Sequence, residues 1–156
     1  MDYEELLDAA DGLGLIAKEK DLRANDGRIK GNRIAIRRDI TYTRKACVLA
    51  EELGHYFTSA GDITDLSDAD SRKQERRAHI WAHDVQIGLD GIIAAEAAGC
   101  RNLYETADFL GVPEDFLAEA IRCYGERYGT EIRYKGSRII LIPGLEVIHE
   151  DEENEK

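Results

Sequence analysis

The chain has 156 residues, of which 43% are hydrophobic and 34% charged, a composition typical of one folded domain, with or without a small helical addition. The net charge of −11 disfavours binding to phosphate backbones, so we expect no direct contact with nucleic acid. Acidic residues follow Met1, and no apolar run is long enough to span a membrane, so we expect a cytoplasmic protein without a signal peptide.

The three cysteines, Cys47, Cys100 and Cys123, are odd in number and form no C-x-x-C pair. This spacing favours neither a disulfide framework nor a thiolate zinc site. We therefore predict that each packs as a small buried hydrophobic residue.

The first 40 residues predict one helix followed by a small, partly antiparallel sheet. Apolar residues recur at helical spacing over 2–12, and 15–17 form a short apolar run. Residues 28–36 predict two strands about a tight Gly-Asn turn, with Ile34 and Ile36 on one face.

A long helix is predicted over 42–59. At about 100° per residue, Glu51, Glu52 and His55 gather in one narrow sector of that helix. The opposite side carries the predicted core stripe: Ala46, Leu49, Ala50, Leu53, Tyr56 and Phe57. A glycine inside a helix costs about 1 kcal/mol relative to alanine, so Gly54 predicts the close approach of another backbone.

A second helix is predicted over 72–86, after a polar loop at 61–71. One of its sectors combines Glu75 and His79 with small residues, which would let the two helices lie close and point both side chains into the shared gap. The remaining large apolar side chains of this helix are expected to enter the core: Ile80, Trp81 and Val85.

The first of these helices contains a variant of a zinc-binding pattern. In H-E-x-x-H, two histidines four residues apart bind Zn²⁺ and the intervening glutamate is the general base. Here Glu51 stands at the first histidine position, Glu52 at the base position and His55 at the second histidine position.

A catalytic zinc site needs three protein ligands and an open fourth position. The two helices offer four donors, Glu51, His55, Glu75 and His79, with Glu52 placed to take a proton from the attacking water. The alternative is that these residues form a solvated helix face, and the residues alone leave both readings open.

The remaining elements are three shorter helices and a hairpin. The helices are predicted over 89–99, 103–110 and 113–128, and the strands over 131–134 and 138–142. The helix-turn-helix rhythm of 103–128 favours a packed helical annex over a DNA reader, with partner docking as a further possibility. Three side chains receive ordinary interpretations: His83 at the surface or supporting the site, His149 solvated, and Tyr56 in the core or contacting substrate.

The segment 46–57, with 61–63 and 72–78, resembles the ImmA/IrrE metallo-endopeptidase family, in particular its phage-encoded members. The similarity extends to 25–36 and 107–120, and so covers most of the chain.

This resemblance implies roles for individual residues. The family's E-x-x-A pattern falls on Glu75, its third zinc ligand, while His55 takes the place of its second histidine and Glu52 that of its catalytic glutamate. E-E-x-x-H resembles a recurrent variant among phage members, in which Glu51 would complete the ligand set. The alternative, with His79 supplying the missing imidazole, would be specific to this chain.

We therefore expect an α+β fold: a minimal zincin-like metallopeptidase core (a small sheet plus two active-site helices) over 1–100. A helical annex and C-terminal hairpin would occupy 101–149, and a disordered acidic tail 150–156.

The resemblance implies a zinc-dependent endopeptidase that cleaves a helix-turn-helix transcriptional repressor of a phage or mobile element. A second hypothesis is a non-catalytic antirepressor that binds its repressor without cutting it. A third is a phage structural or accessory protein with a vestigial site.

Overall fold

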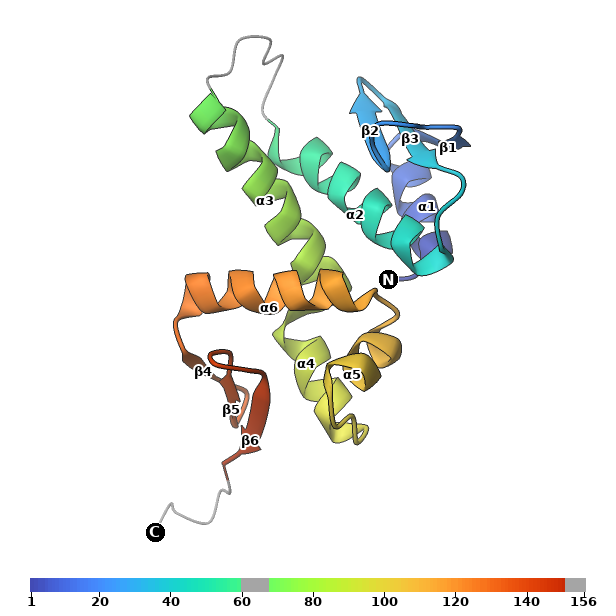
Figure 1. Ribbon diagram of the computed structural model, residues 1–156. Coiled ribbons are helices and arrows are strands. Elements are labelled where there is room, and N and C mark those ends of the chain that lie inside the picture. Colours follow the sequence, from blue (N-terminus) through green and yellow to red (C-terminus); the bar gives the residue numbers. More distant parts are fainter. Residues whose placement is uncertain (60–67, 151–156) are drawn as a thin grey trace. The chain divides into compact units, whose positions relative to one another are not determined.

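The computed structural model describes residues 1–59 and 68–150. These residues form helices α1–α6 and two three-stranded sheets, which confirms the predicted α+β class (Figure 1). The chain divides into two compact units, Met1–Gln86 and Ile87–Lys156. Within the described ranges, no helix is long and apolar enough to cross a membrane. The expected domain limits at 100 and 149 remain predictions, and the acidic tail from 151 onward lies outside the described residues.

The first unit opens with the predicted helix, α1 (Tyr3–Gly12). Asp2 caps its start: its side chain accepts a hydrogen bond from the Glu5 backbone N–H at 2.8 Å, and Glu5 Oε2 accepts one from the Asp2 N–H at 2.9 Å. This reciprocal pair satisfies two backbone donors that a helix start would leave unpaired.

Three strands follow: β1 (Ile16–Lys20), β2 (Gly27–Lys30) and β3 (Arg33–Arg37). The central strand β3 runs parallel to β1 and antiparallel to β2, as the predicted partly antiparallel sheet requires. Ile34 and Ile36 are buried on one face, as predicted.

Strand β1 continues beyond the short apolar run that predicted it. Its charged residues alternate between the two faces, and the inward Glu19 is neutralised by Lys45, whose Nζ lies 2.5 Å from its Oε1. Because Lys45 neutralises Glu19, β1 can include this charged residue, although the hydrophobic pattern alone predicts a shorter strand.

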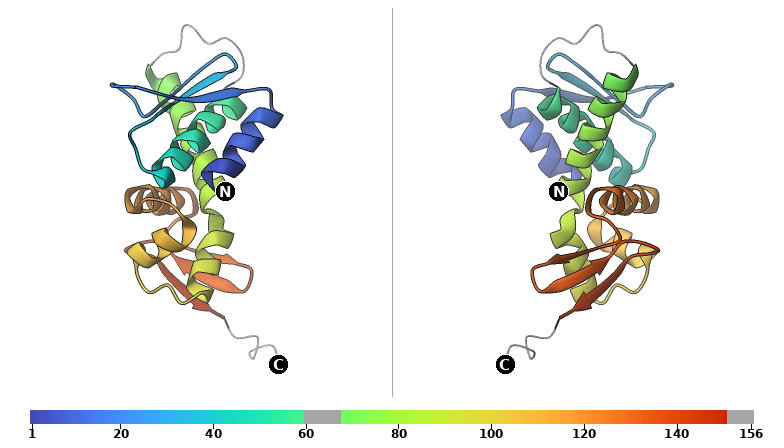
Figure 2. Two further views of the ribbon diagram at one scale, coloured as in Figure 1. Left: turned by 90° about the vertical axis from the view of Figure 1, so that its right-hand side faces the viewer. Right: turned by 90° about the vertical axis from the view of Figure 1, so that its left-hand side faces the viewer.

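Helix α2 (Tyr42–Thr58) packs against α1, β2, β3 and the next helix, α3 (Figures 1 and 2). Because neighbours surround it, burial covers most of its circumference between Ala46 and Ala50 rather than one stripe. The predicted stripe is wrong at its end: Tyr56 and Phe57 are 39% and 50% exposed.

Helix α3 (Asp68–Gln86) begins four residues earlier than predicted, so 68–71 are helical rather than part of the loop. The rest of the predicted polar loop, with 61–63, lies outside the described residues. Ile80, Trp81 and Val85 are only half-buried, contrary to prediction. The buried positions are Ala78, Ala82, His83 and Gln86. Ala78 is in close contact with α2, where only a small side chain fits, which keeps the large side chains at the flanks.

The second unit contains the three predicted short helices, α4 (Gly88–Ala97), α5 (Leu103–Leu110) and α6 (Glu114–Tyr128). Helix α5 packs against both α4 and α6. Cys100 and Cys123 in this unit are half-buried, whereas Cys47 of the first unit is buried, so the prediction for the cysteines is confirmed fully only for Cys47.

Strands β4 (Glu131–Tyr134) and β5 (Ser137–Ile140) form the predicted hairpin. A third strand, β6 (Glu146–His149), pairs with β5 and was not predicted, because only two apolar residues mark it. His149 is therefore not simply solvated. Its ring lies 3.2 Å from Ser137 Oγ and contacts Glu96 of α4.

Candidate metal centre

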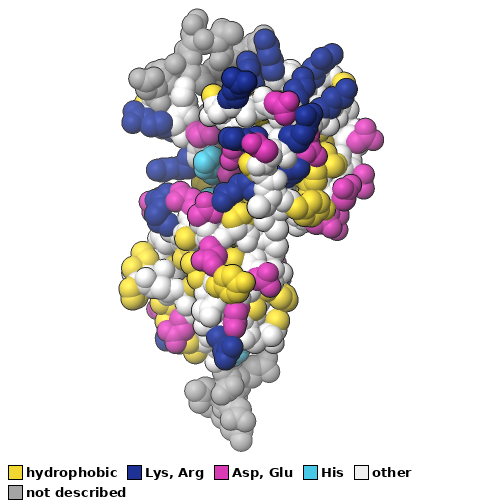
Figure 3. All heavy atoms as spheres, turned by 45° about the vertical axis from the view of Figure 1, so that its right-hand side comes forward, with side chains coloured by type: hydrophobic (Ala, Val, Ile, Leu, Met, Phe, Trp, Pro, Cys, Tyr) yellow, Lys and Arg dark blue, Asp and Glu magenta, His cyan; other side chains and the backbone are white. Residues whose placement is uncertain are grey.

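The carboxylates and imidazole of α2 face a cleft of about 400 Å³ in the first unit. The cleft is bounded by α2, by the segment that leads into β2 and by Glu75 of α3. Histidine and acidic side chains reach the surface together in this unit (Figure 3). The lining residues are Asn25, Asp26, Gly27, Arg44, Cys47, Val48, Glu51, Glu52, His55 and Glu75.

The Glu75 carboxylate lies between two imidazoles. Its Oε2 is 3.1 Å from His55 Nε2, and its Oε1 is 3.4 Å from His79 Nε2. The structure thus brings together residues from α2 and α3 that the sequence predicted to share a site. Their roles as metal ligands stay predictions.

The two helices approach each other closely at Gly54. A Cβ atom at this position would lie 2.4 Å from the carbonyl oxygen of Ala78 and 3.0 Å from its Cα, well inside contact distance. The predicted close backbone approach is therefore confirmed. It sets the spacing across which the neighbouring His55 meets Glu75.

The cleft is electrostatically crowded. Burial raises the pKa of Glu51, Glu75 raises it further, and the nearby His79 acts in the opposite direction. Burial also raises the pKa of Glu52 to about 7, with added repulsion from Glu51 and Glu75. Neighbouring carboxylates thus disfavour the ionisation of Glu51 and Glu52, and a bound cation would relieve that repulsion.

Glu52 is held against the start of β2. A Cβ atom on Gly27 would lie 2.4 Å from Val48 Cγ1 and 3.0 Å from Glu52 Oε1. The backbone of this segment therefore packs directly on the carboxylate, and glycine is the residue that permits the contact.

The donors fit a divalent cation such as Zn²⁺ in type and in pairwise spacing. Zinc bonds of about 2.0–2.2 Å at tetrahedral angles place ligand atoms about 3.3–3.6 Å apart, close to the two distances around Glu75. Within 1–59 and 68–150, no three His, Cys, Asp or Glu side chains already converge on one metal-sized point. Glu75, 57% exposed, has room to rotate toward such a point.

Two features of the site differ from or add to the sequence interpretation. His83 is buried, not at the surface, and its ring centroid lies 6.3 Å from that of His79, as a supporting position would require. Arg44 lines the cleft and was missed. Arg44 precedes Glu51 by seven residues, or two helical turns, and this spacing could have predicted that both lie on the same side of α2.

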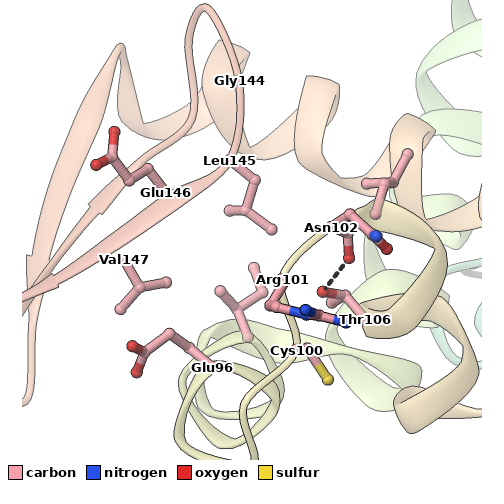
Figure 4. A pocket seen from close by; sticks show the side chains of 11 residues that line it. Glu96, Cys100, Arg101, Asn102, Thr106, Gly144, Leu145, Glu146 and Val147 are labelled. Atoms are coloured by element: carbon pink, nitrogen blue, oxygen red, sulfur yellow. Dashed lines mark hydrogen bonds between the residues drawn. The ribbon is translucent and has the colours of Figure 1, made fainter.

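The second unit has a cavity of its own, of about 500 Å³ (Figure 4). Leu145 and Val147 line it opposite the α4–α5 connection, where the Thr106 hydroxyl donates to the Asn102 carbonyl at 2.9 Å. No histidine is among its lining residues. Candidate metal chemistry therefore stays with the cleft of the first unit.

The sequence matches a peptidase family described as the IrrE N-terminal-like domain over residues 12–122, which includes the whole of α2 and α3. No protein with a curated description matches the chain. Members of the matched family are typically metal-dependent, which agrees with the donors gathered in the cleft. With most of its length inside the match, the chain belongs to the IrrE N-terminal-like family of metallopeptidases.

Proposed function

We propose that the chain is a zinc-dependent endopeptidase whose centre lies in the α2–α3 cleft. The observation that carries this proposal is the Glu75 carboxylate, placed 3.1 Å from His55 and 3.4 Å from His79 beside Glu52. His55 and Glu75 would hold the metal, with Glu51 or His79 as the third ligand. When bound, the metal would polarise the carbonyl of the scissile peptide.

Glu52 would act as the general base. A carboxylate with a pKa of about 7 can accept a proton from the attacking water at neutral pH and return it to the leaving amine. Its packing against Gly27 limits the positions that the carboxylate can take.

The substrate would bind as an extended segment beside β2. The strand order β1-β3-β2 leaves β2 at the edge of the sheet, and its first residue, Gly27, lines the cleft. An edge strand offers unpaired backbone groups to an added strand, so a peptide pairing there would pass the carboxylates.

A helix-turn-helix repressor of a phage or mobile element is the substrate that the family resemblance supports. Its cleavage in the cytoplasm would relieve repression. Such a substrate is a folded protein, so an exposed loop or linker would have to enter the cleft as the extended segment.

The test compares zinc-loaded wild type with Glu52→Gln. We expect about one zinc per chain in both, and new peptide termini by mass spectrometry only with wild type, whether the probe is a proteome-derived peptide library or a purified helix-turn-helix repressor. Cleavage that persists in Glu52→Gln would remove the role of Glu52. Absence of zinc from the wild type after zinc is supplied would overturn the proposal as a whole.

Glu51 favours one alternative, a non-catalytic antirepressor. A carboxylate in place of the first histidine donates more charge to a bound metal and weakens it as a Lewis acid. Under this alternative, wild type would inactivate a repressor only at one chain per repressor, uncut, and Glu51→His could gain cleavage. Absence of any repressor binding would instead support an accessory protein with a vestigial site.

A further inference from the structure

The exposed face of the first sheet carries a dense set of cations. Strand residues alternate between faces, so Ile34 and Ile36 are buried while Arg33 and Ala35 lie on the other side. Five exposed cations share that side, and we call them the basic face: Lys18, Lys20, Arg28, Lys30 and Arg33. Lys and Arg side chains gather over this part of the molecule in Figure 3.

The pairing of the strands places cations on both sides of a shallow trough. Ala35 of the central strand pairs with Lys18 on one side and Arg28 on the other. Neighbouring strands lie about 4.8 Å apart, so these two cations flank the small alanine across about 10 Å. A shallow cavity of about 450 Å³ lies here, and none of its lining residues is acidic.

The basic face lacks the internal ion pairs that other cations next to the same sheet form. Arg37, Arg38 and Lys45 each lie within 4.0 Å of a carboxylate. Within the described parts of the chain, no cation of the basic face forms such a pair. Lys30 and Arg33 even stand directly opposite each other, an arrangement of like charges that destabilises a sheet. Among residues 1–59 and 68–150, no carboxylate lies within 4.0 Å of these two side chains to offset the repulsion, which points to an external anion.

The net charge of −11 conceals this arrangement. Residues 1–86 hold 14 of the 21 Lys and Arg residues but 17 of the 32 Asp and Glu residues. At physiological ionic strength, charges more than about 8 Å away are largely screened, so a ligand at the surface responds mainly to the local set. The expectation that whole-chain charge prevents contact with nucleic acid therefore does not extend to this face.

We propose that the basic face binds the phosphate backbone of duplex nucleic acid without reading its sequence. None of the lining residues is aromatic, so bases of a single strand would find no stacking platform. Three of the five cations are lysines, a residue type depleted from protein–protein interfaces, whereas aromatic residues and methionine are enriched there. Flexible cations on both sides of a shallow trough match a row of phosphates instead.

The proposal is tested by filter binding of a 30-base-pair duplex of arbitrary sequence between 50 and 200 mM salt. Each phosphate contact adds about −0.9 to the slope of log K against log salt, so two to five contacts predict an affinity loss of roughly 10- to 500-fold. Lys18→Gln with Arg28→Gln should weaken binding at 50 mM salt at least tenfold and make the slope less negative by about 1.8. Single-stranded DNA of the same length should bind more weakly than the duplex.

The matched control is Lys73→Gln with Arg77→Gln, which removes the same charge from exposed positions of α3. This control should bind the duplex as wild type does, and circular dichroism should show both double variants folded. Equal losses in the two variants, or no duplex binding at 50 mM salt, would overturn the proposal. A polyglutamate peptide that binds this face while the duplex does not would assign it to an acidic protein. Glu52→Gln should bind the duplex as wild type does. Failure of the duplex-binding proposal can therefore be told apart from failure of the proposed peptidase function.

Discussion

Burial and neighbouring negative charges both disfavour the ionised form of Glu52 in the proposed centre. Its pKa rises from 4.5 to about 7 because it is half-buried next to Glu51 and Glu75. Between these two pH values the folded chain binds a proton that the unfolded chain has released. The stabilisation is therefore complete below about pH 4.5 and lost as the pH rises through 7.

Glu52→Gln should consequently stabilise the metal-free chain at high pH. After treatment with a chelator, we expect a gain of about 1–2 kcal/mol in the free energy of unfolding at pH 8 and little change at pH 5. One pKa unit corresponds to about 1.4 kcal/mol, and partial exposure reduces the effect. Urea unfolding at both pH values measures it, with the exposed Glu4→Gln as control. An equal effect at both pH values would show that ionisation of Glu52 is not the cause.

At the scale of elements, the contact of α2 with α3 positions the site. Gly54 permits the backbone of Ala78 to approach, and the next residue along, His55, reaches Glu75 of the facing helix. A shift of a few tenths of an ångström between these helices would alter the His55–Glu75 distance, whereas the Glu75–His79 distance lies within α3.

Gly54→Ala should therefore destabilise the chain although alanine is the better helix former. Overpacking against the Ala78 backbone costs roughly 1–3 kcal/mol and outweighs the gain of about 1 kcal/mol in helix propensity, for a net loss of up to about 2 kcal/mol. Urea unfolding gives the value. Gly12→Ala is the matched control, because a Cβ there meets nothing within 4 Å. If the two variants have the same stability, the close approach is not a structural constraint.

Elements with strong periodicity could be predicted from the sequence, and those defined by their neighbours could not. Helix α2 and the hairpin of β2 and β3 have local signals for their type and limits. Strand β6 depends on pairing with β5, and the buried set of α3 depends on how near α2 lies. Tyr56 and Phe57 followed the helical period of the core, but their exposure is decided by what packs against the last turn of α2.

The same distinction holds for the candidate site. The positions of Glu52, His55 and Glu75 were predictable from the motif and its family resemblance, which carry spatial information that spacing alone lacks. The bridging of two imidazoles by Glu75, and the burial of His83, are properties of the assembled helices. The basic face could not be predicted from the net charge, because that value adds up residues that the fold places on different parts of the surface.

At the scale of the whole molecule, metal binding should be linked to stability. A ligand present at 100 times its dissociation constant stabilises the folded state by about 2.7 kcal/mol, which predicts a rise of roughly 5–10 °C in the Tm of the transition that includes the first unit. Differential scanning calorimetry with and without zinc measures this shift. His55→Ala should abolish it, whereas His149→Ala, which removes a histidine from the second unit, should retain it. A shift that survives in His55→Ala would place the zinc elsewhere.

Trp81 is the chain's sole tryptophan, and its ring lies against Phe57 with the centroids 5.0 Å apart. That stack joins α3 to α2, the two helices that carry the candidate metal ligands. All indole fluorescence of the protein therefore originates at this one junction between α2 and α3. The emission wavelength and quenching of an unmodified chain would report, without any added label, whether the two helices shift when a cation or a peptide enters.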